Sequence, residues 1–151
     1  MTIEKDINQH KFRNEHQKSA INLIYTFNWM NEKLDKIFEQ YDITQQQFNI
    51  LRILRGAGGG PLSTLQIRQR MLDKMSDTSR IVDRLIKKGL VKKNICKADR
   101  RLVDVVITEK GKRLLEKIDN SSEDMDAIFK NLSQGDAKTL NQLLDKLRNS
   151  G

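Results

Sequence analysis

Hydroxyl, carboxylate and cationic side chains gather between residues 76 and 101, and they are the part of this sequence that could do chemistry. They form two groups on either side of Gly89. The first group is Ser76, Asp77, Thr78, Ser79, Arg80, Arg84 and Lys87, and the second is Lys92, Lys97, Asp99, Arg100 and Arg101. Ammonium and guanidinium groups bind phosphate oxygens, and arginine and hydroxyl groups also contact the edges of bases. We therefore expect these residues to contact double-stranded DNA.

The net charge of the chain is concentrated in the same region. The 151 residues carry a net charge of +8, and the stretch from Pro61 to Ile107 contributes +7 of it, with 12 Lys and Arg against 5 Asp. A concentrated basic lobe is the electrostatic footprint of a protein that binds a polyanion. Charge alone is equally consistent with a solvated surface, so the interpretation depends on the elements that carry these residues.

No pattern in the sequence suits catalysis, a metal ion or a cofactor. The two histidines, His10 and His16, have no cysteine or carboxylate partners at ligand spacing. The glycine run at 58–60 is not followed by the Gly-Lys-Ser/Thr of a phosphate-binding loop. No nucleophile-base pair or paired carboxylates stand out. We therefore expect a protein that is not an enzyme and that binds no metal or cofactor.

The cysteine content and the hydropathy indicate the compartment. Cys96 is the only cysteine, which excludes an intrachain disulfide and suits a reducing environment. No apolar run approaches the roughly 18 residues of a membrane span, and the polar N-terminus lacks the apolar stretch of a secretory signal. We expect a cytoplasmic protein with no membrane partner.

A helix must position the first group of side chains. Residues 76–88 carry Ile81, Val82 and Leu85 at helical spacing. Gly89 follows where a left-handed C-terminal cap belongs. The apolar residues occupy one face, so the hydroxyl and cationic side chains are expected on the other.

A hairpin must position the second group. Residues 90–96 and 102–107 alternate or run apolar and include β-branched residues, which predicts two paired strands with residues 97–101 at the tip. Before the basic helix, a capping box at Ser63 starts a short helix that runs to about Leu72. Two short helices joined by a tight turn and followed by a hairpin form a winged helix-turn-helix, whose second helix enters the major groove.

Amphipathic helices are predicted at both ends of the chain. An apolar stripe runs from about residue 12 to 41, and the polar residues before it are expected to be frayed. Thr44 then opens another helix with a capping box. Thr108 caps a helix that runs to about Asn131, and Ser133 caps the last one. One small lobe cannot cover all of these apolar stripes, so we expect the two chain ends to form an interface with a second copy.

The side chains on the basic helix have separate expected roles. The polar residues at the helix start are expected at base edges, because this end of a recognition helix points at bases most often. Arg80 and Arg84, one turn apart, reach phosphates or guanine edges. Asp83 either holds one of these arginines or forms an i,i+4 pair with Lys87.

The hairpin tip has its own roles. Arg101 suits the narrow minor groove, where the potential is most negative over A/T tracts, and Arg100 suits a phosphate. Asp99 orients a neighbouring guanidinium through a bidentate pair. Lys92 and Lys97 contact phosphates, which adds affinity without sequence information.

Two stretches resemble motifs of the MarR family (multiple-antibiotic-resistance regulators). One is SDTSRIVDRLIKKGLV at 76–91, which is similar to the recognition-helix signature, although Ser79 stands where the family more often has threonine. The other is DRR at 99–101 followed by ITEKG at 107–111, which is similar to the wing and the start of the next helix. The resemblance covers nearly the whole chain in the order and length of the elements.

This resemblance implies a mainly α fold with a small β-hairpin wing, in a single domain over residues 1–151. Its DNA-binding lobe would span about 44–108, and its dimerisation helices about 12–41 and 109–149. The resemblance further implies a homodimer that binds a pseudo-palindromic operator as a ligand-responsive repressor. A small aromatic or anionic effector would release it, and the sequence assigns no residues to the effector pocket.

Two alternatives are kept beside this function. A winged helix can also serve as a protein–protein interaction module, because a fold does not fix its use, although basic charge in both helix and hairpin argues against it. A redox-responsive regulator would use Cys96, which would have to be an exposed and reactive thiolate. The relatives that sense peroxide carry their cysteine near the first helix, where this chain has none.

Overall fold

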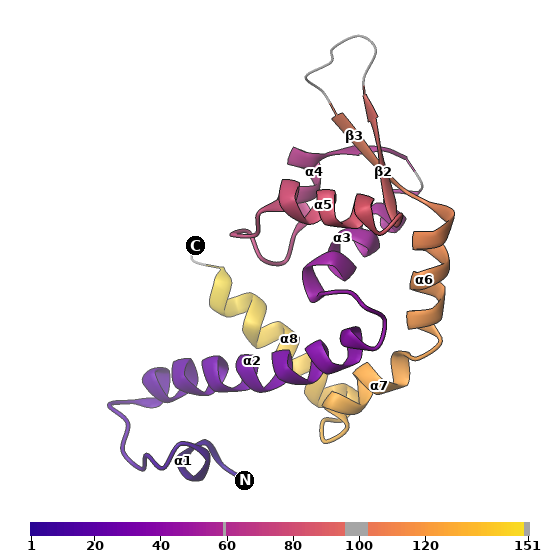
Figure 1. Cartoon of the computed structure of the whole chain (residues 1–151). Helices are drawn as coiled ribbons and strands as arrows, with labels where there is room; N and C mark the ends of the chain where they lie inside the picture. Colours follow the sequence, from indigo (N-terminus) through magenta and orange to yellow (C-terminus); the bar gives the residue numbers. More distant parts are fainter. Residues whose placement is uncertain (59, 96–102, 150–151) are drawn as a thin grey trace.

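A computed structural model of the chain describes residues 1–58, 60–95 and 103–149 (Figure 1). In chain order the elements are α1 (Ile3–Asp6), α2 (Glu15–Glu39), α3 (Gln45–Gly56), β1 (Leu62–Ser63), α4 (Thr64–Arg70), α5 (Thr78–Lys87), β2 (Val91–Ile95), β3 (Val103–Ile107), α6 (Glu109–Asp119), α7 (Ser122–Asp126), the 3-10 turn η1 (Ala127–Phe129) and α8 (Gln134–Arg148). The predicted mainly α fold with a small hairpin is confirmed.

The hydrophobic core is built around α3. This helix starts at the predicted capping box, in which the Thr44 hydroxyl accepts the N–H of Gln47 and the Gln47 side chain accepts the N–H of Thr44. The side chains that are almost fully buried come from α3, α4, α5, the hairpin and α6, and they are Ile50, Leu51, Leu54, Ile67, Val82, Leu85, Val91, Val105, Leu115 and Ile118. These elements therefore form one packed lobe, which has α3 at its centre (Figure 1).

The sheet is antiparallel and has the strand order β1-β3-β2. In the hairpin Val91 pairs with Ile107 and Lys93 with Val105, which confirms the two predicted strands. The third strand, β1, was not predicted, because its two residues are too few to show an alternating pattern. Figure 1 shows the hairpin projecting from the lobe at the end opposite α2.

Short hydrogen bonds join the end of α5 to the hairpin and to α6. Gly89 has a φ of +73°, which confirms the predicted left-handed cap, and the N–H of Leu90 donates to the carbonyl of Leu85 at 3.0 Å. The Thr108 hydroxyl donates to the Gly89 carbonyl at 2.7 Å and accepts the N–H of Gly111 at 3.2 Å, which starts α6. These bonds link the end of α5, the hairpin and the start of α6.

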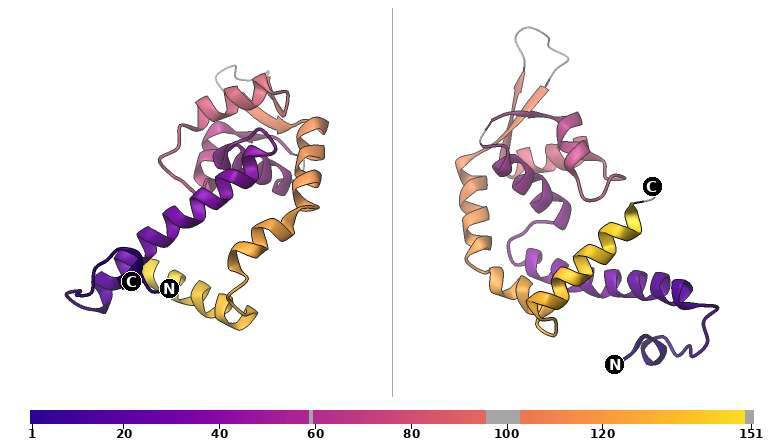
Figure 2. Two further views of the ribbon diagram at one scale, coloured as in Figure 1. Left: turned by 60° about the horizontal axis from the view of Figure 1, so that its bottom comes forward. Right: turned by 180° about the vertical axis from the view of Figure 1, so that it is seen from behind.

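The helices near the chain ends bury little of their apolar surface. Helix α2 has one buried residue, Phe38, and α8 has none. The large apolar side chains that are exposed on these two helices are Leu23, Ile24, Tyr25, Phe27 and Trp29 on α2, and Leu140, Leu143 and Leu147 on α8. Figure 2 shows that α2 extends well beyond the core lobe in both views.

The prediction of one helix from Thr108 to about Asn131 is wrong. Helix α6 ends at Asp119, and the chain turns before α7 and η1. The run from Asp119 to Ser122 supplies short polar side chains, which compete for backbone hydrogen bonds and favour turns over helix interiors. The Asp119 carboxylate also pairs with Arg55 of α3 at 2.6 Å. The turn directs the chain toward α2, which α7 contacts.

The expectation that the N-terminal residues are frayed is also wrong. Ile3 in α1 is 6% exposed, and Glu4 forms an ion pair with Lys18 of α2. Four helical residues are too few to give a periodic pattern, so the sequence did not indicate this helix. Helix α2 itself starts at Glu15, because the Asn14 side chain accepts the N–H of Gln17 and caps it.

Candidate nucleic-acid interface

The outer face of α5 carries most of the first predicted group. Asp77 is the N-cap, since its carboxylate accepts the N–H of Arg80 at 3.2 Å, and the helix begins at Thr78, two residues later than predicted. The exposed side chains of the helix are Ser79, Arg80, Asp83, Arg84 and Lys87. A helix of ten residues is about 15 Å long, and the major groove, about 12 Å wide, admits it.

Two hydroxyl residues of this group face inward. Thr78 is 4% exposed, and neither its hydroxyl nor the buried hydroxyl of Ser76 has a hydrogen-bond partner in the described part of the chain. Thr78 therefore does not lie on the outer face where the sequence placed it, because the later helix start puts it at the packed first turn. Its placement does not support contact with DNA, whereas Ser76 is half-buried and its contact stays a prediction.

Asp83 pairs with the hairpin and not with a residue of its own helix. The Nζ of Lys93, in β2, donates to Asp83 Oδ1 at 2.9 Å. The predicted pair with an arginine or with Lys87 is therefore wrong, because the hairpin folds back and brings a closer cation. Both side chains are about half exposed, so the pair contributes at most about 1 kcal/mol to stability. Its effect is to hold the Lys93 ammonium against α5.

The second predicted group is described only in part. Lys92 is exposed on β2. Lys97, Asp99, Arg100 and Arg101 lie outside the described residues, and so does Cys96, a candidate for redox sensing. The roles assigned to these residues stay predictions.

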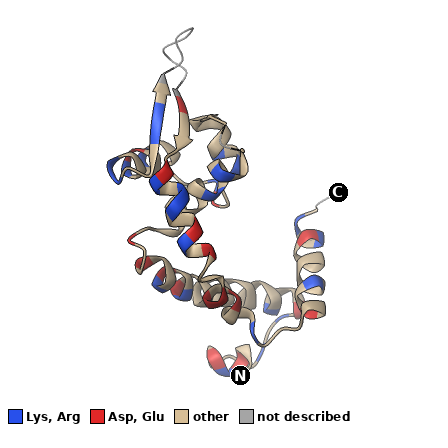
Figure 3. Cartoon of the chain, turned by 90° about the vertical axis from the view of Figure 1, so that its right-hand side faces the viewer, with Lys and Arg blue, Asp and Glu red and all other residues tan. Residues whose placement is uncertain are grey.

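Two arginines of α4 extend the basic surface beyond the predicted set. Arg68 and Arg70 are exposed on α4, which contacts α5. The first helix of a helix-turn-helix crosses the DNA backbone, so exposed cations there suit phosphates. The charge count contained these arginines, but only the position of α4 beside α5 distinguishes them. Figure 3 shows Lys and Arg on the lobe that carries the hairpin, where Asp and Glu also occur.

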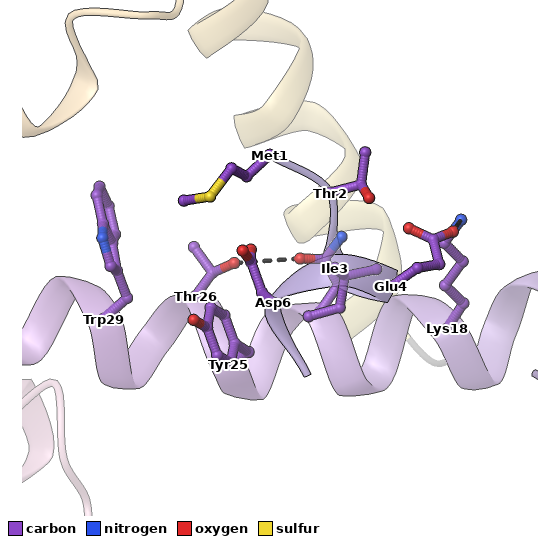
Figure 4. A pocket seen from close by; sticks show the side chains of 10 residues that line it. Met1, Thr2, Ile3, Glu4, Asp6, Lys18, Tyr25, Thr26 and Trp29 are labelled. Carbon is purple, nitrogen blue, oxygen red and sulfur yellow. Dashed lines mark hydrogen bonds and ion pairs between the residues drawn. The ribbon is translucent and has the colours of Figure 1, made fainter. Parts of the chain in front are cut away.

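A pocket of about 550 Å³ lies between α1 and α2, away from α5 (Figure 4). Trp29 and Tyr25 line it from α2, and Glu4 and Lys18 meet across it. The hydrogen bond from Lys18 lowers the pKa of Glu4 to about 2, and the same bond raises the pKa of Lys18. None of the predicted DNA-contacting residues lines this pocket, so it is separate from the candidate interface.

Metal-binding groups and membrane-spanning helices were sought among the described residues. Within 1–58, 60–95 and 103–149, no three His, Cys, Asp or Glu residues are grouped so that they could hold a metal ion. No helix in these ranges is both long and apolar enough to cross a membrane.

Comparisons with known proteins agree with this geometry. The family model described as "MarR family" matches residues 43–103. The transcriptional regulator MgrA of Staphylococcus aureus is 27% identical over 113 residues, which cover 75% of each chain.

A solved structure of a MarR variant from E. coli complexed with operator DNA has a TM-score of 0.79 at 23% identity, and the match covers 92% of this chain and 99% of that one. BpsR of Bordetella bronchiseptica, whose DNA binding is regulated by 6-hydroxynicotinic acid, has a TM-score of 0.76 at 20% identity, covering 87% and 99%. The curated relatives are transcription regulators and not enzymes.

Proposed function

We propose that this chain is a winged-helix transcription regulator of the MarR family, because the family model matches residues 43–103 and the similar proteins include regulators of this kind. In this function it binds a pseudo-palindromic operator as a homodimer and represses transcription until a small ligand releases it. The observation that carries the proposal is the outer face of α5, where Ser79, Arg80, Arg84 and Lys87 are exposed on one surface. A regulator of this kind works at the chromosomal DNA, so we place it in the cytoplasm.

The proposed contacts divide between bases and phosphates. Ser79, Arg80 and Arg84 would face the major groove, because the exposed side of a recognition helix reads base edges there. Lys87 and Lys92 would neutralise phosphates and fix the register of the protein on the duplex. The tip arginine Arg101 would enter the minor groove. A single lobe of this size reads one half-site, which is why a symmetric pair of half-sites requires two copies.

Exposed apolar surface supports the homodimer. The aromatic and aliphatic side chains of α2 and the leucines of α8 are left uncovered in one chain, and contiguous exposed apolar surface of this kind marks an interaction site. Most soluble oligomers are homo-oligomers, and a two-fold pair buries the same patch on both copies. The α2 and α8 helices are therefore the proposed dimer interface.

The experiment measures binding of the full chain to DNA from upstream of its own gene at near-physiological salt. Arg84→Ala should weaken binding by at least about tenfold, since a base contact by arginine contributes about 1–3 kcal/mol of discrimination. The matched control is Lys36→Ala, which removes an exposed cation from α2 and should change affinity by less than about twofold. Equal losses for both variants would indicate general electrostatics only, and absence of DNA binding by the wild type would favour a protein–protein module.

A further inference from the structure

Large apolar side chains are exposed in the turn that leads into the recognition helix. This turn, residues 71–77, joins α4 to α5. Leu72 and Met75 in it are 80% and 91% exposed, although Met71 in the same turn is 3% exposed. Among the described residues of the core lobe, the one other exposed large apolar side chain is Leu65, at the start of α4. Single exposed apolar residues are common, so the meaning of this exposure depends on where the turn lies.

Hydrogen bonds hold the backbone of the turn. The N–H of Leu72 donates to Asn49 Oδ1 at 2.9 Å, and Asn49 is a buried residue of α3. The N–H of Met75 donates to Asp73 Oδ1 at 2.9 Å, and the N–H of Ser76 donates to the Asp73 carbonyl at 3.2 Å. The apolar side chains are therefore exposed on a turn whose backbone is tied both to the core and to itself.

Met75 lies at the end of α5 that is expected to meet the bases. It precedes Asp77, the N-cap of the helix, by two residues. The start of a recognition helix points at base edges most often, so an exposed side chain here would lie at the major groove. The exposed cations Arg68, Arg70 and Lys74 on α4 and the turn suit the phosphates beside that groove. The turn is thus continuous with the proposed DNA interface.

The two carboxylates beside Met75 both bind backbone N–H groups. Asp73 accepts the N–H of Met75, and Asp77 accepts the N–H of Arg80 at 3.2 Å. These charge-assisted bonds hold both carboxylates against the protein backbone. The side chain of Met75 stands between them without a polar group of its own.

The chemistry of the major groove offers one apolar partner for such a side chain. Each base pair presents hydrogen-bonding groups there, but only thymine adds a methyl group, on C5. Methionine is unbranched and polarisable, so its side chain adapts to an irregular apolar surface. An acidic and apolar protein segment could also cover a basic, apolar turn, but the continuity of the turn with the outer face of α5 favours DNA.

We propose that Met75 is a specificity-determining residue that packs against the C5-methyl group of a thymine in each half-site. The proposal rests on the proposed function and adds a base contact outside the predicted set. Burial of one methyl group corresponds to about fourfold in affinity. A symmetric operator makes the contact twice, which gives about tenfold for the pair.

The test compares one operator prepared with thymine and with uracil, which lacks only the methyl group. Binding of the full-length wild type and of Met75→Ala to both DNAs is measured, with the DNA from upstream of the gene as operator. Loss of the methyl groups should weaken binding of the wild type by about tenfold, and of Met75→Ala by less than about threefold. The ratio of these two losses is the coupling between the side chain and the methyl groups. A coupling below about 1.5-fold would overturn the proposal.

Two further variants separate packing on DNA from an effect on the fold. Met75→Leu keeps an apolar side chain of similar volume and should retain a coupling of about twofold or more. Leu65→Ala is the matched control, because Leu65 is 63% exposed at the other end of α4 from the turn. It should lose as much affinity without the methyl groups as the wild type does. The same reduced sensitivity in Leu65→Ala as in Met75→Ala would contradict a contact at Met75.

Replacing the thymines one at a time locates the contact. The coupling should be confined to one base pair in each half-site, and coupling spread evenly over the operator would contradict a single contact. Absence of binding by the wild type to either DNA would refute the proposed function and this contact with it. Tight binding of both DNAs by the wild type, with Met75→Ala unchanged, would overturn the contact alone and would leave the turn to a protein partner.

Discussion

Gly111 shows how closely the first turn of α6 approaches the end of the recognition helix. A Cβ at this position would lie 2.4 Å from the carbonyl oxygen of Leu90 and 2.7 Å from Cγ1 of Ile107. Both neighbours are fixed, one as backbone and the other as a buried core side chain. Only glycine allows α6 to start where the Thr108 hydroxyl can cap it and also bind the Gly89 carbonyl.

Gly111→Ala should therefore destabilise the fold. The added methyl group forces α6 away from the hairpin, and overpacking of this kind costs about 1–3 kcal/mol, here toward the upper end because the obstacle is backbone. The melting temperature should fall by about 5 °C or more. The control is Gly135→Ala, whose Cβ would meet only Ser133 Oγ at an ordinary 3.7 Å. An unchanged melting temperature for Gly111→Ala would contradict the close approach.

The ion pair between Asp83 and Lys93 leads to a prediction about DNA affinity. Asp83→Asn removes a negative charge from the outer face of α5 and releases the Lys93 ammonium for a phosphate. Affinity for operator DNA should rise by about threefold, with a steeper dependence on salt by about one phosphate contact. The free energy of unfolding should change by less than about 1 kcal/mol, because the pair is partly exposed. A loss of affinity would instead mean that Asp83 is needed to position a DNA-contacting cation.

Local side-chain signals made most of the elements predictable. The caps at Thr44, Ser63 and Ser133 all occur as expected, because each is a hydrogen bond between residues three positions apart and needs no tertiary context. The break after Asp119 could not be predicted from the apolar spacing alone, since the apolar positions continue in register beyond it. The strand β1 forms only because β3 lies beside it.

The candidate site could also be predicted in part. The outer face of α5 follows from helical periodicity, so the exposed positions of Ser79, Arg80 and Arg84 agree with expectation. The burial of Thr78 could not be foreseen, because it depends on where the helix begins and on what packs against its first turn. The pairing of Asp83 with Lys93 depends on how the hairpin folds back, which spacing along the chain does not contain.

The short helix α1 should leave α2 as the pH falls. The pKa of Glu4 is lowered to about 2 from 4.5 by its hydrogen bond with Lys18, so the stabilisation is complete above pH 4.5 and is lost between about pH 4.5 and 2. Trp29, the only tryptophan, lines the same pocket, so its fluorescence should report the release. Glu4→Gln removes the titrating group and should abolish this transition. An identical transition in that variant would assign it to other carboxylates.

At the scale of the whole molecule, stability and function are divided between two parts. The lobe formed by α3 to α6 and the sheet has nearly all of the buried side chains, whereas α2 and α8 retain exposed aromatic and aliphatic residues. A lobe that is complete by itself can keep its DNA-contacting face while the end helices pair with another copy. The proposed dimer would then set the spacing of two recognition helices, which a pseudo-palindromic operator requires at about one helical turn.

Leu143→Asp combined with Leu147→Asp tests this division. These leucines are 58% and 66% exposed on α8, so charges there should leave the fold of one chain intact and prevent an apolar interface from forming. Sedimentation should give the mass of one chain for the variant and of two for the wild type. The control is Leu72→Asp, because Leu72 is 80% exposed but follows α4 and belongs to neither α2 nor α8, and this variant should stay dimeric.

The same variant should separate half-site binding from operator binding. Two linked lobes bind the second half-site as an intramolecular step, so losing the partner should weaken binding to the full operator by about 100-fold or more. Binding to an isolated half-site depends on α5 and the hairpin alone and should change by less than about threefold. If the monomeric variant bound the full operator as tightly as the wild type, the exposed faces of α2 and α8 would have another purpose than pairing two recognition helices.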